Sequence, residues 1–237
     1  MPIYRIADLN VEVNPKFKIC RKRLESYAVK SNESGKTDIA ISVSDDEIRE
    51  RLRVSDNLSE QGAEDVLILS KFCNAVLDGF DGFFFHSSCL ELDGEGYVFS
   101  AVSGTGKSTH TALWRRHFGN RVTMINDDKP VIRKCDGKFY AYGTPWMGKA
   151  DIGTNTKAPV KAVYILHRAE ENTAVRVLPS QVMKQLLEAT VIDVERSRME
   201  KLLELLDEFF KKTPLFLLGC NMDESAVMTA YNAANGG

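Results

Sequence analysis

One segment constrains the fold of this chain more than any other: Ala101-Val102-Ser103-Gly104-Thr105-Gly106-Lys107-Ser108-Thr109. The aromatic and β-branched run 96–101 leads into it, and Lys107–Phe118 has the composition of a helix. A strand that ends in a glycine turn and continues directly as a helix is a recurring unit of α/β proteins. The glycines let backbone N–H groups converge, and the helix N-terminus adds partial positive charge. The pattern therefore predicts a phosphate-binding loop.

The loop matches the consensus G-x-x-x-x-G-K-[ST] at Gly106, Lys107 and Ser108, whereas Ala101 stands where the consensus has its first glycine. Lys107 is placed to reach the β- and γ-phosphates, and the Ser108 hydroxyl is placed to ligate a metal ion. The alternative is a turn that caps a helix and contains Gly-Lys-Ser by chance. The strand–loop–helix context favours a nucleotide site, whose expected contacts are Ser103, Gly104, Thr105, Gly106, Lys107, Ser108 and Thr109.

A second candidate element is the apolar strand Val122–Asn126, which is followed by Asp127 and Asp128. Adjacent residues on a strand point to opposite faces, but both carboxylates can turn toward one site if the strand ends between them. One would then hold Mg²⁺, and the other would accept a proton from an attacking hydroxyl. The alternative is a solvated turn, which also suits Asp-Asp-Lys-Pro. The position shortly after the loop favours the functional interpretation.

The chain divides into two stretches. Residues 1–80 combine strand patterns at 4–13 and 38–43 with helix patterns that begin at Ser44 and at Glu60, which predicts a small α+β segment. Residues 81–237 alternate strands with helices and include hairpin signals at 93–96 and 136–137. We expect an α/β fold with a mixed sheet, built as two units or as one continuous domain. The other expected elements are strands at 83–90, 161–167, 174–178 and 214–220 and helices at 180–189, 194–212 and 223–234.

Composition argues against several classes of function. Lys and Arg total 31 against 33 Asp and Glu, for a net charge of −2, which argues against a domain that grips nucleic acid or an anionic membrane. No apolar run approaches the ~20 residues that cross a bilayer, and the alternating N-terminus is unlike a signal or transit peptide. The five cysteines are scattered without a C-x-x-C pair, which suits reduced thiols. We therefore expect a cytoplasmic protein with neither nucleic acid nor membrane as a partner.

The four histidines, taken singly, read as structural residues. His86 follows a Phe-Phe-Phe run, and a lone histidine on an apolar strand is more often a hydrogen-bonded core residue than a ligand. His110 and His117 lie on the expected helix after the loop, and His167 ends a later strand.

The stretch from His86 to Lys149 resembles two related families, HPr kinase/phosphorylase and ATP-dependent phosphoenolpyruvate carboxykinase. The features shared in order are His86-Ser-Ser, a hairpin, the loop at 103–109 and Asn126-Asp127-Asp128. The residue sequence Ser-Gly-Thr-Gly-Lys is most similar to the carboxykinase loop. The chain length and the hairpin before the loop are more similar to the HPr kinase catalytic domain. Vaguer similarity extends through 223–227. The resemblance implies a nucleotide-binding core of the HPr kinase/carboxykinase kind.

The resemblance also implies roles for individual residues. Residues 104–106 and Lys107 would bind the triphosphate of ATP, and Ser108 would ligate Mg²⁺. Asp127 would contribute to the coordination shell of the metal ion, and Asp128 would be the base or a metal ligand. His86 matches a histidine that ligates metal in the carboxykinases and lies near the catalytic Asp in the kinases. If His86 ligates, Mn²⁺ becomes competitive, because imidazole is a softer ligand.

The chain departs from both families after the Asp pair. It has no recognisable oxaloacetate-binding arginine, and the Glu-x-Arg-Gly stretch of HPr kinases is replaced by Gly143-Thr144-Pro145-Trp146-Met147-Gly148-Lys149. A hairpin at 136–137 should return this segment to Asp128. Thr144, Trp146 and Lys149 are therefore candidates to hold the acceptor, the alternative being an ordinary turn around a packed Trp. The expected acceptor is neither HPr nor oxaloacetate.

The expected activity is transfer of the γ-phosphate of MgATP to the hydroxyl of a small molecule or to a serine of a peptide or protein. One alternative is a nucleotide-sensing or nucleotide-binding protein without transfer, which Ala101 and the missing acidic residue after Asp128 suggest. A weaker alternative is a phosphoenolpyruvate carboxykinase-type activity, which the absence of oxaloacetate-dependent ATP consumption would dismiss. The sequence leaves the acceptor, the direction of transfer and the oligomeric state open.

Overall fold

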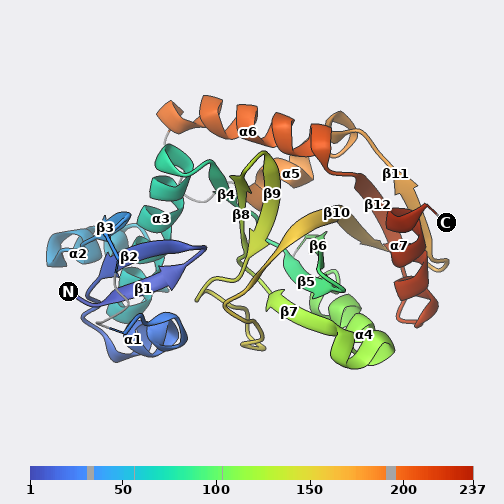
Figure 1. Ribbon diagram of the computed structural model, residues 1–237. Helices are drawn as coiled ribbons and strands as arrows, with labels where there is room; N and C mark the ends of the chain where they lie inside the picture. Colours follow the sequence, from blue (N-terminus) through green and yellow to red (C-terminus); the bar gives the residue numbers. More distant parts are fainter. Residues whose placement is uncertain (31–34, 56, 103, 191–195, 237) are drawn as a thin grey trace.

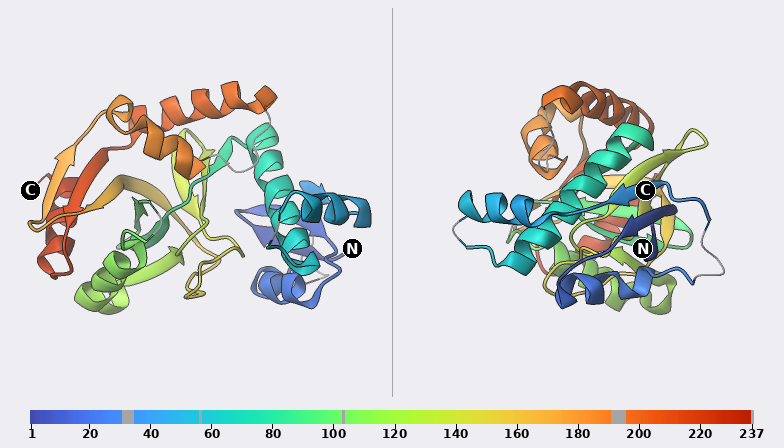
Figure 2. Two further views of the ribbon diagram at one scale, coloured as in Figure 1. Left: turned by 180° about the vertical axis from the view of Figure 1, so that it is seen from behind. Right: turned by 90° about the vertical axis from the view of Figure 1, so that its left-hand side faces the viewer.

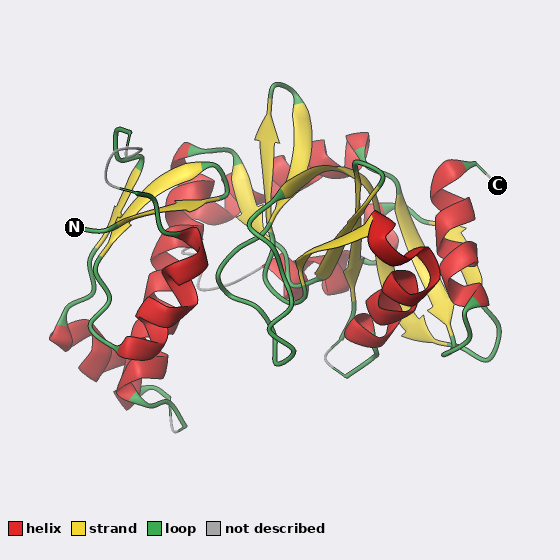
Figure 3. Ribbon diagram, turned by 60° about the horizontal axis from the view of Figure 1, so that its bottom comes forward, coloured by secondary structure: helices red, strands yellow, loops and turns green. Residues whose placement is uncertain are grey.

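The computed structural model describes residues 1–30, 35–55, 57–102, 104–190 and 196–236. These residues form two β-sheets with covering helices, which confirms the α/β class and the mixed sheet (Figure 1). The N-terminus lies beside the smaller sheet at one end of the molecule, and the C-terminus lies at the opposite end (Figure 3).

The smaller sheet belongs to the N-terminal segment. β1 (Ile3–Ile6) and β2 (Leu9–Val13) pair antiparallel, and β3 (Ile39–Ile41) pairs parallel with β2. The prediction of one strand over 4–13 is wrong, because Ala7 and Asp8 adopt positive φ angles of 52° and 61° and turn the chain into a hairpin. The helices of this segment are α1 (Lys18–Leu24), the 3₁₀ helix Glu25–Tyr27, α2 (Asp45–Arg53) and α3 (Glu60–Gly79).

The predicted helix start at Ser44 is confirmed. The Ser44 hydroxyl accepts the Glu47 N–H at 3.2 Å, and the Glu47 carboxylate accepts the Ser44 N–H at 2.8 Å. This reciprocal capping box satisfies two N–H groups that the helix itself cannot pair. The predicted start of the next helix at Glu60 is confirmed as well.

The N-terminal segment shares a hydrophobic core with the rest of the chain. Phe72 of α3 stacks on Trp146 with their ring centroids 5.6 Å apart, and Phe84, Val131 and Tyr142 belong to the same buried cluster. The Arg133 guanidinium donates to the Ala7 carbonyl. The core is thus continuous across residue 80, and the division into 1–80 and 81–237 stays a prediction.

The larger sheet is organised around the long strand β10. The strands follow the order β4-β8-β9-β10-β6-β5-β7, and β12 and β11 extend the sheet from β10. β10 pairs parallel with β6 and β12, whereas every other pair in this sheet is antiparallel among the described residues. The strands are β4 (Gly82–Phe84), β5 (Ser88–Leu92), β6 (Glu95–Ser100), β7 (Val122–Asn126), β8 (Val131–Cys135), β9 (Lys138–Tyr142), β10 (Lys157–Arg168), β11 (Thr173–Arg176) and β12 (Leu215–Cys220).

Helices cover both faces of this sheet. Alternate residues of β10 face opposite sides, so Val163 packs in a cluster with Leu186 of α5 and Phe209 of α6, whereas Tyr164 packs in a cluster with Trp114 of α4. Figure 2 shows α5 and α6 along one side of the sheet and α4 along the other. These helices are α4 (Lys107–Phe118), α5 (Met183–Thr190), α6 (Met199–Lys212) and α7 (Ser225–Asn235), with 3₁₀ turns at Gly119–Arg121, Pro179–Gln181 and Arg196–Arg198.

Most of the other predicted elements differ from the structure by a few residues at one or both ends, and two differ in kind. The expected strand over 83–90 is two strands, because Phe85 donates its N–H to Pro130 O and His86 donates its N–H to Ala189 O instead of continuing a ladder. The expected helix over 194–212 begins as the 3₁₀ turn Arg196–Arg198, and residues 194 and 195 lie outside the described residues.

The backbone at Gly143 is closely surrounded by other backbone atoms. Any side chain at this position is therefore expected to lower the stability of the fold strongly. A Cβ there would lie 2.0 Å from the Thr154 carbonyl oxygen and 2.9 Å from that of Ile125. Both contacts are backbone atoms, so we expect Gly143→Ala to lower the free energy of unfolding by roughly 3 kcal/mol or more. Thermal unfolding measures this as a fall in Tm of roughly 6 °C or more for a chain of this size.

Gly79→Ala is the matched control, because no atom lies within 4 Å of the Cβ position at the end of α3. If both variants keep the Tm of the wild type, the close approach of the Thr154 and Ile125 carbonyl oxygens to Gly143 is contradicted.

Candidate functional site

The predicted strand–loop–helix unit is present. β6 ends at Ser100 and α4 begins at Lys107, and the loop between them contains Gly104 at φ 81° and Gly106 at φ 119°. Both angles lie in the left-handed region that side chains disfavour, so these two positions require glycine. Gly106 is the N-cap of α4, and as a glycine it offers no side-chain oxygen to the first N–H groups of the helix, which are available to an anion. Ser103 lies outside the described residues.

The polar side chains at the start of α4 differ in exposure. Ser108 and Thr109 are exposed, whereas Lys107 is half-buried and donates from Nζ to Ala101 O at 3.2 Å. Burial lowers the pKa of Lys107, and the negative charge of Asp128 opposes that shift. The ammonium of Lys107 thus lies over the loop and within electrostatic reach of the Asp pair.

Asp128 is paired with two cationic or protonatable groups. His86 Nε2 lies 2.9 Å from Asp128 Oδ1, and Lys129 Nζ contacts Asp128 Oδ2. Burial by itself raises the pKa of Asp128, but the hydrogen bonds from His86 and Lys129 outweigh it and bring the pKa to about 2. The carboxylate is therefore ionised at neutral pH.

His86 reaches Asp128 because three hydrogen bonds fix the backbone between β4 and β5. The His86 N–H donates to Ala189 O at 2.7 Å, and the His86 carbonyl accepts from Ser100 Oγ at 3.0 Å. The next residue, Ser87, donates its N–H to Asp128 O at 3.1 Å. The imidazole is thus a hydrogen-bond partner of Asp128 and is partly exposed rather than enclosed in the core, whereas its catalytic role stays a prediction.

Asn126 organises the turn that carries the two carboxylates. Its side-chain oxygen accepts the N–H groups of Asp128 at 2.8 Å and Lys129 at 2.6 Å, and its amide nitrogen donates to Thr144 O at 3.0 Å. Fully buried, Asn126 therefore ties the end of β7 to the segment after β9.

Asp127 faces that same segment. Its Oδ1 accepts the Gly148 N–H at 2.7 Å, and the site of a Cβ on Gly148 lies 3.3 Å from Asp128 Cβ. Burial raises the pKa of Asp127, the hydrogen bond from Gly148 lowers it, and the charge of Asp128 raises it. The prediction that the hairpin returns the 143–149 segment to the Asp pair is confirmed.

Within that segment, the expected acceptor contacts need a correction. Thr144 is fully buried and its hydroxyl donates to Lys129 O at 2.5 Å, and Trp146 is 2% exposed with its Nε1–H donated to Asp65 Oδ1 at 3.2 Å. Their polar atoms are used inside the protein, so Thr144 and Trp146 hold the loop in place. Lys149 is exposed beside them.

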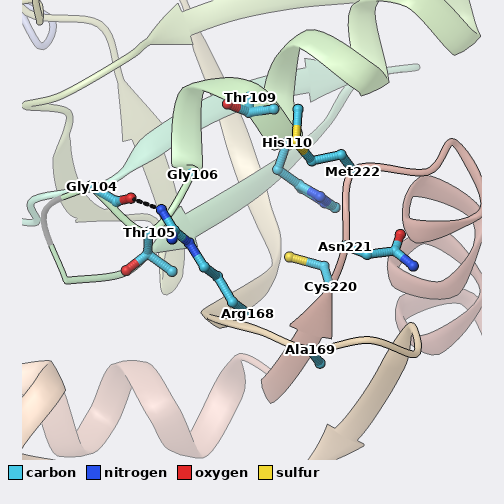
Figure 4. A pocket seen from close by; sticks show the side chains of 10 residues that line it. All are labelled: Gly104, Thr105, Gly106, Thr109, His110, Arg168, Ala169, Cys220, Asn221 and Met222. Carbon is cyan, nitrogen blue, oxygen red and sulfur yellow. Dashed lines mark hydrogen bonds between the residues drawn. The ribbon is translucent and has the colours of Figure 1, made fainter.

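A cavity of about 470 Å³ adjoins the loop, a size typical of small-molecule sites. It lies at the edge where the parallel strands β6, β10 and β12 end, which is where ligands bind in open α/β sheets. Figure 4 shows the residues that line it, and the Arg168 Nη2 group donates to Gly104 O at 2.8 Å. The other lining residues include Thr105, Thr109, His110, Cys220, Asn221 and Met222.

The sequence interpretation missed Lys129, His110 and Arg168. Lys129 was detectable as the neighbour of Asp128. Arg168 was not, because only the pairing of β10 with β6 brings the end of one strand beside the loop that follows the other. Burial lowers the pKa of His110 to about 4, which keeps its ring neutral near pH 7.

The oxygen donors present fit Mg²⁺. Within the described ranges no group of three or more His, Cys, Asp or Glu side chains that could hold a metal is found. The Ser108 hydroxyl and the carboxylate oxygens of Asp127 and Asp128 are hard donors, and Mg²⁺ is usually held by one or two carboxylates together with substrate phosphates. A metal here would therefore be bound together with a nucleotide. No helix in the described part of the chain is both long and apolar enough to cross a membrane.

The fold and the site together define an α/β protein with a strand–glycine loop–helix unit, whose cavity opens at the carboxyl edge of its parallel strands. Among solved structures, the chain is similar to the HPr(Ser) kinase/phosphatase from Coxiella burnetii, with 12% sequence identity and a TM-score of 0.37. The similarity covers 65% of this chain and 93% of that one. No protein-family model matches the sequence, and no curated protein matches it either.

Proposed function

We propose that this protein is an ATP-dependent phosphotransferase that moves the γ-phosphoryl group of MgATP to the hydroxyl of a small molecule or to a serine of a peptide or protein. The observation that carries this proposal is the position of the Asp128–His86 pair beside the phosphate loop. Ser100, the last residue of the strand that leads into the loop, donates its hydroxyl to His86 O at 3.0 Å, and the charge of Asp128 acts on the pKa of Lys107. Phosphoryl transfer needs little beyond such positioning and charge neutralisation.

The loop and the cavity would bind the nucleotide. Backbone N–H groups at 104–108 and the ammonium of Lys107 would hold the phosphates, and the 470 Å³ cavity would take the remainder of the molecule. Ser108 and Asp127 would hold Mg²⁺, which, when bound, neutralises charge on the β- and γ-phosphates. ATP chemistry and the five free cysteines favour the cytoplasm as the location.

Asp128 would act on the acceptor. As the acceptor oxygen forms its bond to the γ-phosphorus, its proton passes to the Asp128 carboxylate, the bond from the γ-phosphorus to the bridging oxygen breaks, and ADP leaves. His86 orients the carboxylate through its 2.9 Å contact and limits the positions that Asp128 can take. Lys149, the exposed member of the returning segment, would lie on the acceptor side.

A second candidate function is nucleotide binding without transfer. The observation in its favour is that His86 and Lys129 both engage Asp128 and bring its pKa to about 2, which weakens the carboxylate as a base. The Asp128→Asn experiment described in the Discussion separates the two candidates.

The proposed activity is tested by an acceptor screen. The purified protein is incubated with MgATP and panels of polyols, amino acids and serine-containing peptides, with ADP measured by a coupled assay and products by mass spectrometry. We expect one acceptor class to gain a phosphoryl group in proportion to the ADP formed. ADP formation that no acceptor stimulates would contradict the proposed transferase.

Removal of divalent metal should abolish the activity. The Ser108 hydroxyl and the carboxylates of Asp127 and Asp128 supply no positive charge, so Mg²⁺ would be needed to offset the negative charge of a triphosphate bound beside them. We expect excess EDTA to reduce phosphoryl transfer to background and added Mg²⁺ to restore it, with Mn²⁺ as a second test metal because His86 is nearby. Transfer that continues unchanged in EDTA would contradict the arrangement.

A further inference from the structure

His110 is held in one orientation and in one protonation form. Trp114 Nε1–H donates to His110 Nε2 at 3.0 Å, and Phe99 packs against the imidazole with ring centroids 4.9 Å apart. A nitrogen that accepts a hydrogen bond carries no proton, so the proton of the neutral ring is on Nδ1. His110 therefore presents an Nδ1–H donor.

That donor is buried, and no hydrogen-bond partner for it is found in the described part of the chain. The residue is only 2% exposed. An unpaired buried donor costs free energy and is rare in folded proteins, so its presence needs a reason. A structural role through Trp114 accounts for Nε2 but leaves Nδ1 unexplained.

The cavity beside the phosphate loop supplies that reason. His110 lines it, and Figure 4 shows the ring extending from α4 toward the Cys220–Met222 side. His110 follows Lys107 by three positions, which is about 4.5 Å along a helix axis, so it lies beyond the part of α4 that faces the phosphates. Ligand atoms that reach His110 would belong to the sugar or the base.

We propose that His110 donates a hydrogen bond from Nδ1 to an acceptor atom in the nucleoside part of the bound nucleotide, an inference that rests on the proposed function. Two other polar side chains of the cavity already have partners within the protein. Asn221 accepts from Asn172 at 3.0 Å and donates to Glu170 O at 2.8 Å, and Arg168 donates to Gly104 O. His110 thus distinguishes a nucleotide from a bare polyphosphate.

Two substitutions separate this role from the structural one. In His110→Gln the amide oxygen can take the place of Nε2 and keep the Trp114 bond, but the Nδ1–H donor is lost. In His110→Asn the amide nitrogen can take the place of Nδ1, but the acceptor for Trp114 is lost. Isothermal titration with MgADP and with magnesium pyrophosphate, which has no nucleoside, is carried out on both variants and the wild type.

We expect His110→Gln to weaken MgADP binding about tenfold while pyrophosphate binding changes less than about twofold. His110→Asn should bind MgADP nearly as the wild type does, although its Tm falls because the indole N–H is left unpaired. Equal MgADP affinity in the wild type and His110→Gln, or an equal loss for both ligands, would overturn the inference. A wild-type chain that binds neither ligand would overturn the proposed function itself.

Discussion

Replacing Lys107 with alanine should weaken the binding of a non-hydrolysable MgATP analogue by about 100-fold. The Lys107 ammonium lies over the phosphate loop, donating to Ala101 O at 3.2 Å, and burial lowers its pKa, so much of its hydration is already removed. Contacts of a charged donor with phosphate are typically worth ~1.5–3 kcal/mol, and each 1.4 kcal/mol is about tenfold in affinity. Isothermal titration measures the change directly.

The control for this experiment is Lys184→Ala. Lys184 lies on α5, which packs on the face of the sheet opposite α4, and its side chain is 86% exposed and 3.9 Å from Glu188. The Lys184→Ala variant loses the same positive charge at a position outside the candidate site. Its affinity for the MgATP analogue should therefore equal that of the wild type. Equal affinity in Lys107→Ala and the wild type would show that the loop does not bind nucleotide phosphates.

Replacing Asp128 with asparagine should lower the rate of phosphoryl transfer by about 10³-fold while the affinity for the MgATP analogue stays within a few-fold. Asparagine has nearly the same volume and its oxygen can still accept from His86, so the turn held by Asn126 should persist. The amide cannot take up the acceptor proton. The measurement is single-turnover formation of phosphorylated acceptor, beside titration with the analogue.

Asp207→Asn is the matched control, because Asp207 is an exposed carboxylate on α6 that pairs with Lys211. It should leave both transfer and binding unchanged. Transfer that survives in Asp128→Asn would exclude Asp128 as the base, and a wild type that binds nucleotide without transferring it to any acceptor would favour the binding protein.

The pKa of Asp128 adds a condition on the pH dependence of transfer. Because hydrogen bonds from His86 and Lys129 bring that pKa to about 2, the carboxylate is ionised throughout the neutral range. If Asp128 is the proposed base, its protonation should therefore not limit the rate of transfer anywhere in the neutral pH range.

Local sequence determined the parts of the structure that depend on neighbouring residues. α4 and β7 have the predicted bounds, Lys107–Phe118 and Val122–Asn126, and Ser44 caps α2 as expected. Helix periodicity, capping and glycine turns act over a few residues, so the same interactions operate in the folded protein and in any window of its sequence. The phosphate loop belongs to this group, since its glycines and the helix after it are contiguous.

Tertiary structure decided which distant residues meet. The break at 85–87 that brings His86 to Asp128 depends on Ala189 and Pro130, and the burial of Trp146 depends on Phe72 and Asp65. The sequence alone does not distinguish His110 from an ordinary core histidine. The cavity beside it exists only because β10 pairs with β6 and β12. Such contacts join segments tens of residues apart, and their free energy comes from burial and hydrogen bonding that exist only once the sheet has assembled.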